Sequence, residues 1–385
     1  MEYFLGAFVF ATCGFIFLLF YFDVSPKTFL FKVIRRFIDP PARLRPLLRD
    51  APYRRATTEK RLHKPVLLNL QTSDGSGQAC HPDVVFVPGG FGPQRWPYWM
   101  VCTPYPYQNS YFENPEIFVS CDGITWTIPE GLQNPLVPSP KNPGDHNSDP
   151  DILLFESELW LFYRSTRRSK TPREIPDENK IYLMKSADGV HWSQPSEILS
   201  EKTRSQLMSP AVIHDGTQFV MWTIEIHGDE FQLIRRTSSN GFAWSVPTIG
   251  TVVGLEAGRY PWHIDVIPEE DRLSAVLVSC LGPSGIGSRI HYAYSEDLGL
   301  TWRAGNFLFE QIYEFEANVQ YRASLRKTTQ DPQSYELWYS ACSLTNVFSI
   351  AFLKLVRTQD TMLPHEIRPH ENGTLTPAKQ ASFRA

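Results

Sequence analysis

The chain has 385 residues, with 37 Lys and Arg against 41 Asp and Glu and a formal net charge of −4. Its hydrophobic content of 42% and charged content of 20% exclude intrinsic disorder, and the length permits one large domain or two of medium size. Aromatic residues reach 13% beside 31 prolines, which favours short strands joined by turns over long helices.

The first predicted element is an apolar run at residues 3–22. Twenty helical residues span about 30 Å, which matches the hydrocarbon core of a bilayer. Only Met1 and Glu2 precede the run, and the basic flank and cleavage site of a signal peptide are missing. The sequence therefore predicts a single N-terminal transmembrane helix at residues 1–22.

A basic juxtamembrane stem is predicted at residues 23–64. Within it, Lys27–Arg61 holds 11 Lys and Arg against 3 Asp and Glu, a charge of +8 that leaves −12 for the rest of the chain. Residues 29–38 alternate apolar and basic positions at helical spacing, which favours an interfacial helix on anionic lipid over a solvated stem. The positive-inside rule then predicts a cytoplasmic body, with an extracytoplasmic body as the alternative. Membrane lipid is thus an expected partner, whereas nucleic acid is not.

A turn recurs four times in the remainder of the chain. Its copies are Ser120–Trp126, Ser186–Trp192, Ser239–Trp244 and Ser295–Trp302, with Trp-to-Trp steps of 66, 52 and 58 residues. In such a turn, Asp or Asn bonds backbone amides, Gly adopts positive φ and Trp packs back onto the sheet. It resembles the Asp-box turn of sialidases and related propellers. The resemblance makes the turn carboxylates structural, and poor catalytic candidates: Asp122, Asp188 and Asp297.

A second repeat precedes each turn and predicts the innermost strand of each unit. Its copies are His81–Val85, Asp149–Leu153, Ser209–Ile213, His263–Ile267 and, more weakly, Tyr321–Leu325. Two further strands follow each copy before the turn. Four strands per unit and five units predict an all-β fold, a five-bladed β-propeller over residues 65–357. A spare strand at residues 65–70 is expected to close the ring, and residues 358–385 to form a flexible tail.

Charged residues gather in and around the segments that are expected to line the central funnel. Carboxylates that share one cavity push each other's pKa values apart, as acid–base catalysis requires, although some are expected to bond free backbone amides instead. The predicted catalytic residues are Asp83, Asp149, Glu225 and Asp265. The predicted substrate-binding residues are His81, Glu113, Asp151, Arg164, Arg259, Trp262, His263 and Arg322. Further aromatic residues are expected either to stack on sugars or to lie in the core: Trp96, Trp99, Tyr105 and Tyr107.

The repeat pattern over about residues 65–357 resembles the five-bladed propeller glycosidases of the arabinanase, xylosidase and invertase type. In that superfamily a base or nucleophile Asp lies in blade one, an auxiliary Asp in an Asp-Pro step of blade two, and a general-acid Glu in blade three. The resemblance implies the auxiliary role for Asp149. In blade one His81 precedes Pro and Asp83 lies two residues later, while Ser209 stands where the Glu is expected.

Two classes of function stay open. One is a membrane-anchored glycoside hydrolase-like enzyme that cleaves or transfers a glycosidic bond, with a phosphorylase that binds phosphate through arginines as a variant. In the hydrolase, a group such as Glu225, Asp265, His81 or His263 would replace the missing acid. The other is a non-catalytic glycan-binding or scaffold propeller in polysaccharide assembly. Carbohydrate is the expected partner in either class. No cofactor is predicted, although a funnel His with Asp neighbours could hold calcium or zinc.

Overall fold

The computed structural model describes residues 64–142, 144–169, 177–201, 206–227, 230–282, 285–329, 331–358 and 361–364. The predicted transmembrane helix, nearly all of the basic stem and the residues beyond 364 lie outside this set. Among the described residues, no helix has the length and apolar character needed to cross a membrane. The chain divides into two units, Met1–Lys60 and Arg61–Ala385, and every described residue belongs to the second.

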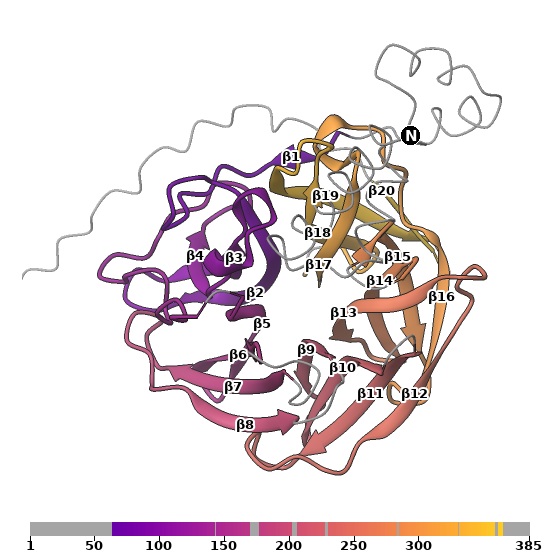
Figure 1. Cartoon of the computed structure of the whole chain (residues 1–385), viewed down its shortest axis with the longest axis horizontal. Helices are drawn as coiled ribbons and strands as arrows, with labels where there is room; N and C mark the ends of the chain where they lie inside the picture. The colour runs from indigo at the N-terminus through magenta and orange to yellow at the C-terminus, as the bar shows by residue number, and fades with distance from the viewer. Residues whose placement is uncertain are drawn as a thin grey trace, which may run out of the picture. The chain divides into compact units, whose positions relative to one another are not determined.

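The second unit is all-β, and its blades follow one another around a ring (Figure 1). Blade one contains β2 (Ala79–Phe91), β3 (Trp96–Pro104) and β4 (Glu116–Ser120), and blade two contains β5 (His146–Phe155), β6 (Glu158–Arg167), β7 (Glu178–Ser186) and β8 (Ser196–Glu201). Blade three contains β9 (Gln206–His214), β10 (Phe219–His227), β11 (Glu230–Ser238) and β12 (Thr248–Val253). Blade four contains β13 (Tyr260–Pro268), β14 (Leu273–Cys280), β15 (Arg289–Ser295) and β16 (Thr301–Phe307). Blade five is built on β17 (Val319–Lys327), β18 (Ser334–Cys342) and β19 (Phe348–Thr358).

The ring closes through the first strand of the unit. Strand β1 (Val66–Leu67) pairs antiparallel with β19 of the last blade, as predicted for the spare strand. Strand β20 (Thr361–Pro364) also pairs with β19, so strand pairing continues past the predicted propeller boundary at residue 357. Met362 in β20 is buried, and its apolar side chain explains why this part of the polar tail joins the sheet.

Two blades depart from the predicted four-stranded unit. Blade one has three strands, and its fourth is reduced to a single bridge between Val119 and Thr127. Pro129 follows this bridge and has no amide to continue the ladder. The outer strands of blades three and four, β12 and β16, pair in parallel and join those blades into one eight-stranded sheet. Three short 3-10 helices lie in loops: η1 (Pro106–Gln108), η2 (Ser110–Phe112) and η4 (Glu314–Glu316).

The four repeated turns have the predicted hydrogen bonds. In the second copy, the Asp188 carboxylate accepts the amides of Val190 and His191, and the Trp192 indole donates to the Gly189 carbonyl. In the third copy the anchoring hydroxyl belongs to Ser238, which accepts the Gly241 amide, so the turn begins one residue before the predicted Ser239. The turn carboxylates bond these loops and lie outside the funnel.

Each turn glycine packs against a tryptophan on the second strand of the preceding blade. The pairs are Gly189 with Trp99, Gly241 with Trp160, Gly299 with Trp222 and Gly123 with Trp338. The second strand of blade four has no tryptophan, and blade five has no such turn. The junction between blades four and five therefore lacks both the tryptophan and the turn. The tryptophans and the turns form one inter-blade contact, which explains the abundance of both in the sequence.

The contact predicts a large effect of a single methyl group at Gly189. A Cβ there would lie 2.1 Å from the Trp99 ring, at a φ of +80°. Gly75 is the matched control, because its φ is +77° and a Cβ would meet nothing within 4 Å. We expect Gly189→Ala to lower the free energy of unfolding by about 1–3 kcal/mol more than Gly75→Ala, measured by urea unfolding. Equal losses in the two variants would show that backbone strain alone explains the glycine.

Candidate functional site

A β-bulge interrupts the innermost strand of every blade at its funnel end. In the first three blades a residue of the bulge has a left-handed backbone: φ is +55° at His81, +51° at Asp149 and +43° at Ser209. Non-glycine residues adopt this conformation at an energetic cost, and such strain concentrates at functional sites. The bulge position that the repeat identifies is therefore the place to look for chemistry.

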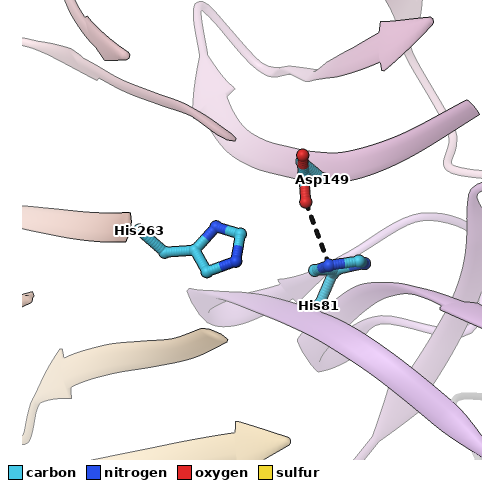
Figure 2. Close-up of side chains that lie close together, drawn as sticks. All are labelled: His81, Asp149 and His263. Atoms are coloured by element: carbon cyan, nitrogen blue, oxygen red, sulfur yellow. Dashed lines mark ion pairs between the residues drawn. The ribbon is translucent and has the colours of Figure 1, made fainter. Parts of the chain in front are cut away.

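His81, Asp149 and His263 converge from blades one, two and four (Figure 2). One potential metal-ligand atom from each residue lies within 4.8 Å of the other two, and all three residues are buried. His81 Nε2 is 3.0 Å from Asp149 Oδ1. Among the described residues, His263 Nε2 has no hydrogen-bond partner, and the one polar contact of Asp149 Oδ1 is with His81 Nε2. When the proton of His81 is on Nδ1, the lone pairs of all three residues face one another in a buried space, and a bound cation satisfies that arrangement.

The second oxygen of Asp149 is fully engaged. Arg164 Nε lies 3.0 Å from Oδ2, and the Ser209 amide donates to the same oxygen at 3.4 Å. Burial alone would raise the pKa of Asp149, but the charge of Arg164 and the contact with His81 hold it well below its usual range. Burial lowers the pKa of His81 and of His263. The group therefore offers one carboxylate and two neutral imidazoles, a common ligand set for divalent metals.

Arg164 was predicted to bind substrate, but its guanidinium is committed to holding Asp149. It donates to Ser148 Oγ at 2.8 and 3.1 Å and to the Leu207 carbonyl at 3.0 Å. Its Nη2 also lies 3.3 Å from Nε2 of His146, whose pKa is lowered to about 3 by burial and by Arg164 itself. The neutral His146 ring can therefore accept from the guanidinium.

Asp83, Asp151 and Asp265 form a second buried group, whose carboxylate oxygens lie within 4.8 Å of one another. Each carboxylate accepts a backbone amide from the next blade: Ile152 at 2.6 Å, Val212 at 3.1 Å and Leu325 at 2.7 Å. Burial raises the pKa of all three groups, and that of Asp265 to about 7. The carboxylates of Asp83 and Asp265, predicted as catalytic, and of Asp151, predicted to bind substrate, therefore bond amides at strand entrances and join neighbouring blades.

Arg322 lies between the two groups. Its Nη2 is 3.5 Å from Asp151 Oδ1 and donates to the Pro210 carbonyl at 3.3 Å. The positive charge of Arg322 opposes the rise that burial causes in the pKa of the three blade-joining carboxylates. The same charge contributes to the lowered pKa of His81 and of His263. Arg322 therefore serves as the counter-charge of the acidic group. It was predicted to bind substrate, and its side chain is fully buried.

Glu113 follows η2 directly and is close enough to Asp149 for the charge of Asp149 to act on its pKa. Its carbonyl accepts the amide of Asn147, two residues before Asp149, and this bond ties the loop to β5. Burial and the charge of Asp149 raise the pKa of Glu113 to about 8, while Arg164 and the Ser148 hydroxyl act in the opposite direction. A carboxyl that stays protonated at neutral pH can donate a proton. Glu113 is thus a better proton donor than its predicted role in substrate binding implied.

Two other predicted site residues, Glu225 and Arg259, contact partners within their own blades. Glu225, a predicted catalytic acid, is 2.8 Å from Arg236 and 3.5 Å from His227, both in its own blade. Arg259 donates to Ser279 Oγ and the Gly287 carbonyl within blade four. Both side chains therefore form contacts that stabilise their own blades.

The aromatic residues that were predicted as sugar-stacking surfaces are largely core. Trp262 is 3% exposed, and its indole donates to the Tyr321 hydroxyl at 3.0 Å. Trp99 is fully buried in the inter-blade contact, whereas Tyr107 is 68% exposed. Sequence reasoning did not assign roles to Thr103 and Ser209, which contact the two site histidines. The repeat singles out only Ser209, which occupies the same bulge as His81 and Asp149.

Comparison with known proteins identifies the fold class and one relative. No family model matches the chain. A curated relative from Flavonifractor plautii, an A type blood N-acetyl-alpha-D-galactosamine deacetylase, is 28% identical over 268 residues. The match covers 58% of this chain and 34% of that protein, so the chain spans about a third of the relative's length.

Among solved structures, an N-acetylgalactosamine deacetylase from F. plautii, in complex with blood group B trisaccharide, superposes with a TM-score of 0.66 at 22% identity, over 76% of this chain and 94% of that one. A thermostable family-43 glycoside hydrolase gives 0.56 at 11% identity, over 75% and 93% of the two chains. The Bombyx mori GH32 β-fructofuranosidase gives 0.56 at 13%, over 81% and 67%. The predicted resemblance to the five-bladed propellers of the arabinanase, xylosidase and invertase type is confirmed, and at these identities it defines the fold.

Proposed function

We propose that this propeller is a metal-dependent carbohydrate hydrolase that removes the N-acetyl group from an amino sugar in a glycan. The observation that carries the proposal is the convergence of the buried residues His81, Asp149 and His263, in which His263 Nε2 has no partner among the described residues and Asp149 Oδ1 contacts His81 Nε2. The similarity to a relative described as an N-acetylgalactosamine deacetylase supports the choice of reaction.

The residues present fit a divalent cation. His81 Nε2, Asp149 Oδ1 and His263 Nε2 would hold it, and three protein ligands leave a position for substrate, as in catalytic zinc sites. When bound, the cation would supply Lewis-acid polarisation of the amide carbonyl. The charged ligand is supplied by Asp149, which Arg164 keeps in place and ionised. This choice replaces the expectation that no cofactor takes part.

The proton balance assigns a role to Glu113. In amide hydrolysis, water adds its oxygen to the acetyl carbon, the C–N bond breaks, acetic acid leaves and the sugar nitrogen gains one proton. A carboxyl with a pKa of about 8 is protonated at neutral pH and can deliver that proton. In the proposal, Glu113 protonates the departing amine and is recharged by the proton that the attacking water loses.

A second candidate function is glycoside hydrolysis. Asp149 has a pKa well below its usual range and Glu113 has one near 8, so the two carboxyls have the opposite protonation states that a glycosidase requires. This pair would replace the predicted set of Asp83, Glu225 and Asp265. A phosphorylase has weaker support, because the guanidinium of Arg259 already donates to Ser279 Oγ and the Gly287 carbonyl.

The test compares the two products. The full chain, loaded with zinc, manganese or cobalt, is incubated with oligosaccharides that end in N-acetylgalactosamine or N-acetylglucosamine, and acetate, free amine and reducing ends are measured. We expect acetate and amine with the glycosidic bond intact, with loss of turnover after chelation and recovery on adding metal. Release of a reducing sugar that survives chelation would favour the glycosidase, and neither product would favour a glycan-binding scaffold.

The proposal keeps the membrane anchor and the cytoplasmic side as sequence-based expectations. The apolar run at residues 3–22 and the positive charges that follow it support them. Protease treatment of intact, right-side-out membranes tests the side. A cytoplasmic body is protected until the membrane is opened, whereas an extracytoplasmic body is cleaved at once.

A further inference from the structure

Each histidine of the His81–Asp149–His263 group is held by a hydroxyl on its Nδ1. The His81 ring contacts Thr103 Oγ1 at 3.0 Å, and the His263 ring contacts Ser209 Oγ. Thr103 lies on β3 of the same blade as His81, whereas Ser209 lies on β9, one blade before His263. In both rings the opposite nitrogen, Nε2, is the one that faces Asp149 or the unpartnered space.

Ser209 contacts two members of the group from a third blade. Its amide donates to Asp149 Oδ2 at 3.4 Å, and its hydroxyl contacts His263 Nδ1. The residue has a φ of +43° and is fully buried. A serine in this strained conformation places one amide and one hydroxyl on two different side chains. It is also the residue that stands where the resembling glycosidases have their general-acid Glu.

The hydroxyls determine which nitrogen of each ring can bind a cation. A neutral imidazole carries one proton, and a cation binds the nitrogen that lacks it. If Nδ1–H donates to a hydroxyl oxygen, Nε2 has the free lone pair. The opposite tautomer would leave a buried N–H of His263 without an acceptor, which costs more than an unpaired lone pair. Thr103 has an acceptor of its own, the Cys80 carbonyl at 3.5 Å, so its oxygen is free to accept from His81.

We propose that Ser209 is a positioning residue that fixes the Nδ1–H tautomer of His263, so that its Nε2 lone pair faces a divalent cation. Thr103 is placed to accept Nδ1–H of His81 once a cation replaces the proton between His81 Nε2 and Asp149 Oδ1. The inference rests on the proposed metal-dependent function and names the residues that prepare its site. Ser209 stands at the position of the general-acid Glu of the resembling enzymes, and in the proposal it orients the metal ligand His263. Groups that orient metal-bound histidines in this way change metal affinity by about 10–100-fold when they are removed.

Two matched variants test the proposal on the full chain. Ser209→Ala removes the hydroxyl from His263 and leaves the Thr103 contact, and Thr103→Val does the converse with an isosteric side chain. Long-range 1H–15N spectra of the metal-free, 15N-histidine-labelled protein report the tautomer of each ring. In the metal-free parent we expect Nδ1–H at His263 and Nε2–H at His81, where Asp149 Oδ1 lies 3.0 Å from Nε2. Ser209→Ala should change the tautomer of His263 alone, and Thr103→Val should leave both tautomers unchanged.

Zinc and cobalt affinities, measured by calorimetry, provide the second readout. Each variant is expected to bind about 10–100-fold more weakly than the parent. An unchanged tautomer of His263 in Ser209→Ala and unchanged affinities in both folded variants would overturn the positioning roles. If the parent shows the expected tautomers but binds no cation, the proposed function fails while the tautomer assignment stands, because that spectrum needs no metal. The parent spectrum keeps the test decisive if Ser209→Ala does not fold, because Nε2–H at His263 would overturn the assignment.

Discussion

Asp149→Asn is expected to reduce turnover by at least about 10²-fold and to weaken divalent-metal binding. The substitution keeps the shape of the side chain and removes the only carboxylate of the His81–Asp149–His263 group. It also removes the charge that Arg164 neutralises. Asn tolerates the left-handed backbone at this position, where φ is +51°, so the variant is expected to fold. Steady-state acetate release and calorimetric metal titration measure the two effects.

Asp83→Asn is the control for this prediction. The Asp83 carboxylate accepts the Ile152 amide at 2.6 Å and the Ser324 hydroxyl at 2.9 Å, and an amide group can accept only one of them with its oxygen. We expect a loss of about 1–3 kcal/mol in the free energy of unfolding, with metal affinity retained. If Asp83→Asn abolished metal binding while Asp149→Asn bound metal like the parent, the assignment of the two acidic groups would be reversed.

Glu113→Gln is expected to lower kcat by about 10²–10⁴-fold, because glutamine cannot give up a proton. In the parent, kcat/KM is expected to fall as pH rises through about 8, where Glu113 ionises. The same limb should be missing from the residual activity of the variant. A pH–rate profile of both proteins checks the assignment, and an identical high-pH limb in the two would remove Glu113 from proton transfer.

The same carboxyl predicts how stability changes with pH. The pKa of Glu113 is raised from 4.5 to about 8 in the folded chain, chiefly by burial, so folding favours its protonated form. Its contribution to stability is complete below about 4.5 and is lost as pH rises through about 8. The free energy of unfolding of Glu113→Gln should therefore rise relative to the parent across this window, as urea unfolding at several pH values would show. A difference that is constant with pH would contradict the burial of an ionisable group here.

The fold was predictable because its determinants are local and repeated. The turn at Asp188–Trp192 identifies one blade by itself, and the spacing of its copies counts most of the others. The closing strand at Val66–Leu67 followed from the need to complete the last sheet. The missing fourth strand of blade one was not predictable in the same way, because a single bridge and a proline replace a pattern that the other blades share.

The site was harder to predict because it depends on which blades face one another. His81 and His263 lie 182 positions apart, and only the closed ring brings their rings to a centroid distance of 5.7 Å. Carboxylates two residues apart, such as Asp149 and Asp151, point to different tasks, and the repeat alone does not separate them. Their hydrogen-bond partners do, since Asp151 bonds the Val212 amide and Asp149 contacts Arg164 and His81.

A crystal of the full chain soaked in manganese or zinc, with data collected at the metal absorption edge, tests the central claim most directly. The account predicts one anomalous peak bounded by His81 Nε2, Asp149 Oδ1 and His263 Nε2, at about 2.0–2.2 Å from each when the metal is zinc. It also predicts that the peak disappears in Asp149→Asn. A peak among Asp83, Asp151 and Asp265 instead, or an ordered His81–Asp149–His263 group without any peak, would contradict it.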